Sequence, residues 1–108
     1  QMNLVYQHVM KNFSRRLPLE EVAEIMNMSV SSFSRYFKSR ANKSFSDFLC
    51  EIRIGHACKM LHEEKMNISQ VCYESGFFTL SNFNKQFKEV TGQTPLQYKK
   101  TYLETIQL

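Results

Sequence analysis

The sequence predicts an all-α fold of seven helices, and three observations support this prediction. Glycine and proline are scarce, with 3 Gly and 2 Pro among 108 residues, so few turns interrupt the chain. Apolar residues recur three and four positions apart, which is the spacing of a helix with one buried face. One pattern of helix, turn and longer helix also occurs twice, as expected of a duplicated supersecondary unit.

The duplication is visible in two pairs of matching stretches. Leu19-Glu-Glu-Val-Ala matches Ile68-Ser-Gln-Val-Cys 49 positions later, whereas Phe33-Ser-Arg-Tyr-Phe-Lys matches Phe83-Asn-Lys-Gln-Phe-Lys 50 positions later. The second copy has therefore gained one residue in its turn. We interpret the chain as two helix-turn-helix subdomains, residues 1–44 and 65–108, joined by a long linker helix over residues 45–64.

The first subdomain is expected to open with a helix over residues 3–13, whose inner face would carry Leu4, Val5, His8 and Val9. The first copy of the repeat begins after Pro18. Acidic residues at positions 20 and 21 favour a helix start there, because carboxylates stabilise the positive end of a helix dipole.

The second helix of this copy has clear start and stop signals. Ser29 is a plausible N-cap, since its hydroxyl can accept a hydrogen bond from a backbone N–H in the first turn. Phe33, Phe37 and Ala41 then recur every four residues on the inner face, and Asn42 can end the helix. Such spacing favours a core role for the phenylalanines over base stacking.

The second copy has equivalent signals. Gly76 suits the sharp turn because glycine tolerates a positive φ, and Thr79 is the expected N-cap. The inner stripe of the following helix is Phe83, Phe87 and Val90, and Gly92 ends it. A last helix starts at Pro95, and the apolar positions of the linker helix are Phe48, Leu49, Ile52, Ala57, Met60 and Leu61.

Charge is segregated along the chain. The formal net charge is +4; residues 30–43 hold four basic and no acidic side chains, whereas residues 19–26 hold three glutamates and no base. This separation indicates a basic face, and a basic face favours a polyanionic partner such as nucleic acid.

The exposed sides of the two longer helices carry residues that recognise DNA. At 100° per residue, Ser31 and Arg35 lie opposite the phenylalanines, with Ser34 and Lys38 beside them. Arginine can form a bidentate bond to guanine, asparagine can do so to adenine, and serine reaches either base type. The second copy exposes an equivalent set: Ser81, Asn84, Lys85 and Lys88. Leu80 either touches a thymine methyl or staples the turn.

Other classes of function are less well supported. The same charges would serve a helical module that binds an acidic protein, so this alternative stays open. An enzyme is disfavoured, because no nucleophile–base pair, metal-ligand cluster or glycine-rich phosphate loop is visible. The three cysteines lack a C-x-x-C pair, so we expect buried thiols, no metal ion and no cofactor. No apolar run is long enough to cross a membrane.

These motifs resemble the DNA-binding domain of AraC/XylS-type bacterial transcription regulators. The resemblance covers about residues 4–100. It is carried by Phe33-Ser-Arg-x-Phe-Lys, by Arg53-Ile-x-x-Ala-x-x-Met-Leu, and most specifically by Gly76-Phe77, Phe83-x-x-x-Phe-Lys and Gly92-x-Thr-Pro-x-x-Tyr98. It implies a homeodomain-like fold with two recognition helices that bind adjacent major-groove segments of promoter DNA, usually to activate transcription.

Carried over by position, the resemblance implies roles for individual residues. The base-contacting set would be Ser31, Ser34, Arg35, Leu80, Ser81, Asn84 and Lys85, and the phosphate-contacting set would be Ser29, Lys38, Arg53, Thr79 and Lys88. Arg53 on the linker could equally pair with Glu51 or Asp47 on the surface. Three residues depart from the family pattern: Cys72 replaces alanine, Lys85 replaces arginine, and Phe78 replaces a polar turn residue.

We expect the chain to bind double-stranded DNA and RNA polymerase and not to bind a membrane. The expected location is the bacterial cytoplasm, at the nucleoid. A linker helix of about 19 residues is about 28 Å long, close to the 34 Å or so between successive major-groove segments, so one monomer could read both. Because the chain starts at Gln1, we expect an excised C-terminal fragment that is monomeric and whose full-length protein could dimerise through a preceding N-terminal domain. Short stand-alone members of the family are the alternative.

Overall fold

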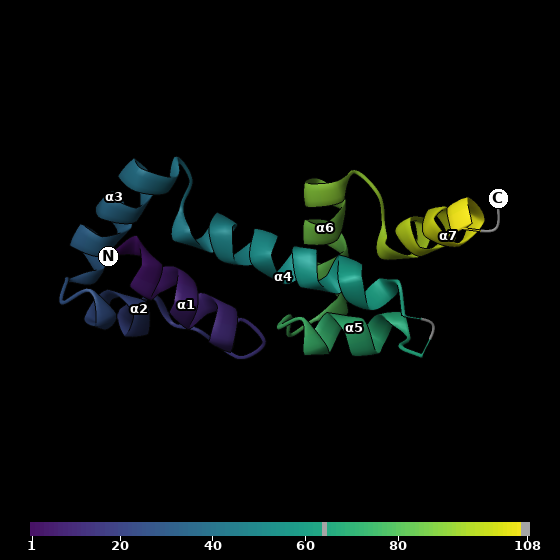
Figure 1. The fold of residues 1–108 in the computed structure, drawn as a ribbon, viewed down its shortest axis with the longest axis horizontal. Coiled ribbons are helices and arrows are strands. Elements are labelled where there is room, and N and C mark those ends of the chain that lie inside the picture. The colour runs from purple at the N-terminus through teal and green to yellow at the C-terminus, as the bar shows by residue number, and fades with distance from the viewer. Residues whose placement is uncertain (64, 107–108) are drawn as a thin grey trace. The chain divides into compact units, whose positions relative to one another are not determined.

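The computed structural model describes residues 1–63 and 65–106, and over these residues the chain forms seven α-helices and no strand (Figure 1). The helices are α1 (Met2–Asn12), α2 (Leu19–Ile25), α3 (Val30–Ala41), α4 (Phe45–Leu61), α5 (Ile68–Glu74), α6 (Leu80–Thr91) and α7 (Pro95–Ile106). The predicted all-α fold with seven helices is confirmed. No helix in the described part of the chain is both long and apolar enough to cross a bilayer.

The chain forms two compact units. The first spans residues 1–52 and contains α1, α2, α3 and the first half of α4, and the second spans residues 53–108 and contains the rest. The division therefore falls inside α4. The linker helix is predicted to end at residue 64, which lies outside the described residues. In the structure α4 ends at Leu61.

The core of the first unit forms around α3. Phe33 and Phe37, one turn apart, are fully buried, and both ring centroids lie within 6 Å of the Phe45 ring, at 5.7 and 5.4 Å. Val5 and Val9 on α1 and Val22 on α2 belong to the same core. Each buried aromatic side chain removes about 150–250 Å² of surface from water. Burial of both rings therefore favours the orientation of α3 in which its apolar stripe faces the core.

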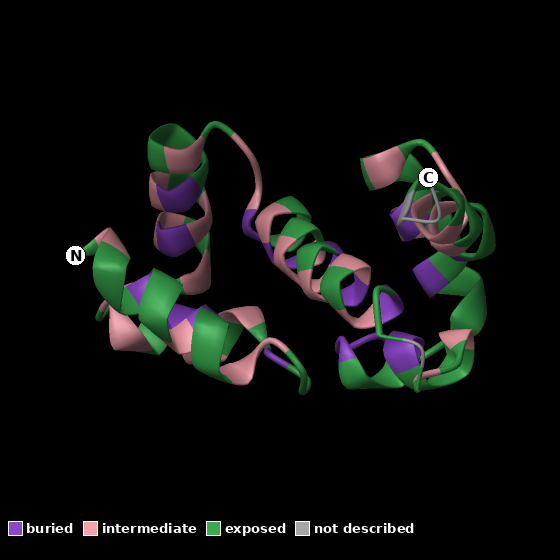
Figure 2. Cartoon of the chain, turned by 45° about the vertical axis from the view of Figure 1, so that its right-hand side comes forward, coloured by how far each residue is buried: buried purple, intermediate pink, exposed green. Residues whose placement is uncertain are grey.

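The second unit repeats this arrangement around α6. Phe83 and Phe87 are fully buried with ring centroids 5.7 Å apart. The Phe87 ring meets Tyr98 of α7 edge-on at 5.5 Å, and in the first unit Phe37 contacts Phe48 in a tilted arrangement at 5.3 Å. Figure 2 shows buried segments on both long helices of the repeat, bordered by exposed ones.

For two residues the prediction that they lie on the buried face of their helix is wrong. Leu4 is 52% exposed and Val90 is 46% exposed. The buried stripe of α1 follows Val5 and Val9, and Leu4 lies about 100° away from it. In α6 the stripe continues from Phe87 to Thr91, which is four residues on and donates its hydroxyl to the Phe87 carbonyl at 2.8 Å.

The linker helix α4 buries different stripes in its two halves. Phe45 and Leu49 are buried in the first unit, and Ile54, Ala57 and Leu61 are buried in the second. Ile54, absent from the predicted apolar positions, is only 1% exposed. Since two residues advance a helix by about 200°, the change from Ile52 to Ile54 moves the apolar stripe to another side of the helix.

We predict that Phe87→Ala destabilises the second unit by about 3–5 kcal/mol, because it removes a fully buried ring and leaves a cavity. Thermal unfolding followed by circular dichroism measures the loss. Val90→Ala, on the exposed side of the same helix, is the control and should change stability by less than about 0.5 kcal/mol. Equal melting temperatures for Phe87→Ala and the unmodified chain would contradict the core assignment.

A polar network ties α1 to α2. The Arg15 guanidinium donates to both carboxylate oxygens of Glu21, at 3.1 and 2.6 Å, and His8 Nε2 lies 2.5 Å from Glu21 Oε2. Hydrogen bonds from Arg15, which has the largest effect, and from His8 lower the pKa of Glu21 to about 2. The carboxylate is therefore ionised in the folded state well below the pH at which it protonates in the unfolded chain.

A depressed pKa in the folded state predicts a pH dependence of stability. The contribution of Glu21 should be complete above about pH 4.5 and should disappear as the pH falls toward about 2. Melting temperatures of the unmodified chain and of Glu21→Gln, measured from pH 7 to pH 2, should converge over that interval. Glu20→Gln, in the same helical turn, is the control. A constant difference between the Glu21→Gln and unmodified curves would rule out the proposed linkage.

Candidate nucleic-acid interface

The turn before α3 is built by Asn27, Met28 and Ser29. Asn27 has a positive φ of 55°, and the Met28 N–H donates to the Ala23 carbonyl at 3.0 Å, which closes the end of α2. Ser29 is the N-cap of α3, as predicted: its side-chain oxygen accepts from the backbone N–H of Ser32 at 3.2 Å. A capped start fixes the direction in which α3 leaves the turn.

The turn before α6 has the same hydrogen bonds. Gly76 has a φ of 103°, and the Phe77 N–H donates to the Cys72 carbonyl at 3.1 Å. Thr79 is the N-cap of α6, as predicted, and accepts from the Asn82 N–H at 3.1 Å. The two copies therefore share a helix-turn-helix motif, and both long helices end at a left-handed residue, Asn42 and Gly92.

The outer face of α3 carries hydroxyl and cationic groups. Ser31, Arg35 and Lys38 are exposed, and Ser34 is half-buried at the edge of the face. The helix contains no acidic residue. Near its end, the Arg40 guanidinium lies over the Tyr36 ring at 5.0 Å. The face therefore presents hydrogen-bond donors and positive charge around one arginine.

The outer face of α6 carries an equivalent set. Ser81, Asn84, Lys85 and Lys88 are exposed, and Leu80 is 36% exposed. One acid, Glu89, belongs to this helix. Ser31 and Ser81, Arg35 and Lys85, and Lys38 and Lys88 are pairs 50 positions apart in the chain. The repeat thus brings the predicted base-contacting residues of each copy onto one helix face.

Some of the basic residues have partners within the chain. Arg53 is half-buried on α4 and interacts with other residues of the chain, and its phosphate contact stays a prediction. The Lys43 ammonium forms an ion pair with Glu51, with Nζ 2.9 Å from Oε1. Lys43, which belongs to the basic run, therefore contributes less to a positive surface than Arg35 or Lys38.

The three thiols lie on α4 and α5, and none belongs to α3 or α6. Cys72 is fully buried, whereas Cys50 and Cys58 are half-buried, so the expectation that all three are buried is wrong for two of them. Burial raises the pKa of the Cys58 and Cys72 thiols, which keeps them protonated and poorly nucleophilic at neutral pH. Among the described residues, no group of three histidine, cysteine or acidic side chains could hold a metal ion.

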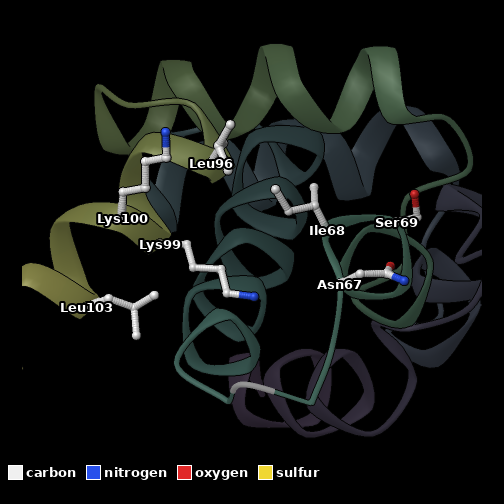
Figure 3. Close-up of a pocket in the computed structure, with 7 residues that line it drawn as sticks. All are labelled: Asn67, Ile68, Ser69, Leu96, Lys99, Lys100 and Leu103. Carbon is white, nitrogen blue, oxygen red and sulfur yellow. The ribbon is translucent and has the colours of Figure 1, made fainter.

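The second unit also has a shallow hollow between α5 and α7, of about 450 Å³ (Figure 3). Apolar Ile68, Leu96 and Leu103 line it together with Lys99 and Lys100. Lys99 is engaged with the protein, because its ammonium donates to the Met66 carbonyl at 3.3 Å. The residues that line the hollow include no acid, thiol or histidine.

Phe78 is exposed in the second turn and was absent from the predicted site. Its exposed fraction is 65%, the largest among the exposed bulky apolar side chains of the described residues. A signal was present in the sequence, because the second copy gains one residue in this turn.

Two turn-linked helix pairs, each with a capped second helix and a polar, basic outer face, define a DNA-binding protein of the helix-turn-helix class. The profile of a helix-turn-helix domain family matches residues 22–101. The chain belongs to this family, in its AraC-type branch, and is a DNA-binding domain of transcriptional regulators.

Several bacterial proteins that resemble this chain are named only in general terms, as uncharacterized HTH-type transcriptional regulators. YdeC of Bacillus subtilis is 30% identical over 99 residues, which cover 92% of this chain and 33% of YdeC. A Staphylococcus aureus regulator is 32% identical over 98 residues, covering 91% of this chain and 13% of that protein. The chain thus spans a third or less of the length of these two relatives.

Solved structures share the fold. The C-terminal domain of AraT, a response regulator from Geobacillus stearothermophilus, is 34% identical with a TM-score of 0.83, over 90% of this chain and 81% of that one. The DNA-binding domain of the global transcriptional factor AdpA, solved in complex with a target DNA, has a TM-score of 0.85 at 21% identity, over 91% of this chain and 88% of that one. The latter likeness concerns the fold alone.

We predict that Ser29→Ala lowers the free energy of unfolding by about 1 kcal/mol, because α3 loses its N-cap hydrogen bond. Ser29→Asp is the matched variant and should retain full stability, since aspartate caps as well as serine. Denaturant unfolding of both variants measures the difference. The capping role would be refuted if Ser29→Ala and Ser29→Asp had the same stability.

Proposed function

We propose that this chain binds promoter DNA sequence-specifically through α3 and α6, placed in adjacent major-groove segments, and thereby regulates transcription, mainly by activation. One observation carries the proposal: two capped helices bury phenylalanines on one side and present matched hydroxyl and cationic groups on the other, to which α6 adds the amide of Asn84. A helix is narrow enough to enter the major groove, where each base pair has a distinct donor and acceptor pattern.

In this proposal the outer faces read the bases. On α3, Arg35 forms the bidentate contact to guanine, with Ser31 and Ser34 beside it. On α6, Asn84 is suited to adenine, whereas Lys85 and Ser81 contact base edges without a fork geometry. Leu80 reaches a thymine methyl or staples the turn; both roles fit a side chain that is 36% exposed.

Phosphate contacts fix the position of the two helices on the duplex. Ser29 and Thr79 lie at helix N-termini, where the dipole favours an anion. Lys38 and Lys88 are exposed and flank the reading faces, and Arg53 on α4 is a third cationic candidate. Each phosphate that is neutralised releases counterions, so affinity should fall steeply as salt rises.

We further propose that α4 acts as a linker between subdomains 1–44 and 65–108, so that one monomer reads two half-sites. In this arrangement the half-sites lie about one helical turn of DNA apart, roughly 10–10.5 base pairs. Selection of binders from a random oligonucleotide pool tests this directly. We expect two conserved blocks at that spacing, and a single block would refute the arrangement.

The cellular role follows from the same proposal. We propose a bacterial regulator of the cytoplasm that acts at the nucleoid, contacts RNA polymerase, needs no cofactor and catalyses no reaction. As the chain stands we propose a monomer, with dimerisation left to further parts of a longer protein. A sequence-specific protein binds its operator at least about a thousandfold more tightly than random DNA. Equal binding of operator and random DNA would contradict the proposal and favour the alternative, a helical module that binds an acidic protein.

We predict that Arg35→Ala weakens binding to the selected operator by about 1–3 kcal/mol and relaxes selectivity at one base pair. Arg35→Lys is the matched control, because it keeps the charge but lacks the planar fork. It should lose the same selectivity while its salt dependence stays unchanged. Fluorescence titrations against all four bases at each position measure both effects. Uniform weakening across all sequences would show that Arg35 contacts phosphate and not a base.

A further inference from the structure

The extra residue of the second turn can be identified from the backbone hydrogen bonds. Asn27 and Gly76 both have a positive φ. The following residues, Met28 and Phe77, both donate to the carbonyl five residues before them, at 3.0 and 3.1 Å. The N-caps follow directly in the first copy, at Ser29, but only after Phe78 in the second. Phe78 is therefore the residue without a counterpart in the first turn.

Phe78 is not needed by the core of its unit. Phe77 takes the place that Met28 has in the first turn, and it is only 5% exposed, with its ring centroid 5.3 Å from that of Phe83. Phe78 is 65% exposed. Most of its ring is therefore left in water, where a phenylalanine gains little of the burial energy that it can supply.

The position of Phe78 relates it to the proposed DNA-reading face. It directly precedes Thr79, the N-cap of α6, and exposed Leu80 and Ser81 follow, where the chain enters the helix from α5 (Figure 1). In helix-turn-helix proteins the N-terminal residues of the recognition helix contact base edges. The apolar group that a base presents in the major groove is the C5-methyl of thymine.

We propose that Phe78 is a specificity-determining residue that packs against the C5-methyl group of one thymine in the half-site read by α6. The inference rests on the proposed function and assigns a base to a residue outside the reading face of α6. The occupant is DNA because the exposed ring adjoins the capped start of the helix that would enter the groove. Phe78 then supplies an apolar contact where Lys85 lacks the bidentate fork of an arginine.

The test uses the complete chain and the operator obtained by selection. Each thymine of the α6 half-site is replaced in turn by deoxyuridine, which lacks the methyl group but keeps every hydrogen-bonding atom. Dissociation constants are measured for the unmodified chain and for Phe78→Ser. Tyr73→Ser is the matched control, because Tyr73 is also exposed, at 52%, but lies on α5. Thermal unfolding verifies that all three chains are folded.

We expect one deoxyuridine substitution to weaken binding of the unmodified chain about fourfold, as for the loss of one buried methyl group. Phe78→Ser should bind the thymine operator at least about fourfold more weakly and lose nothing further on that deoxyuridine operator. Tyr73→Ser should behave as the unmodified chain.

Two results would overturn the inference while leaving the proposed function intact. One is a Phe78→Ser chain that binds the operator as tightly as the unmodified chain. The other is a Phe78→Ser chain that still loses about fourfold at every methyl-sensitive thymine, which would assign the methyl contact to another side chain such as Leu80. Equal binding of operator and random DNA by the unmodified chain would overturn the proposed function itself.

Discussion

The burial of two phenylalanines one helical turn apart, in α3 and again in α6, is the constraint on which the rest of the structure depends. Phe33 and Phe37 in the first unit and Phe83 and Phe87 in the second are fully buried. Because a helix has a fixed 100° rotation per residue, covering these rings determines which side chains face outward. The chemistry of the outer faces is thus a consequence of packing on the inner ones.

The N-caps and turns add direction to that orientation. Ser29 and Thr79 accept hydrogen bonds from the first turns of α3 and α6, and a positive φ at Asn27 and Gly76 allows the sharp change of direction before them. These turn and cap bonds recur in both units. A duplicated motif therefore gives two similar outer faces. They differ in side chains, such as arginine at position 35 against lysine at position 85, and the second turn has one extra residue, Phe78.

Much of this was predictable because it is local. Cap residues, turn residues and the four-residue spacing of phenylalanines act within one or two helical turns, and the predicted caps at Ser29 and Thr79 and stops at Asn42 and Gly92 are confirmed. The burial of Leu4 and Val90 was predicted wrongly, because the spacing of apolar residues does not show which of them lie at the border of the buried face. Which neighbour covers a residue at that edge is decided by packing, not by spacing.

The sequence by itself determined the seven helices, the caps and stops of α3 and α6, and the duplication. These follow from local propensity and from an internal comparison of the chain. The tertiary structure alone decided three things. It showed that α4 buries two different stripes, with Ile54 in the second, that Arg53 and Lys43 have partners within the chain, and that Phe78 lies outside the core while Phe77 lies within it. Each of these depends on contacts between segments distant along the chain or on the exact path of a turn, which neither composition nor periodicity specifies.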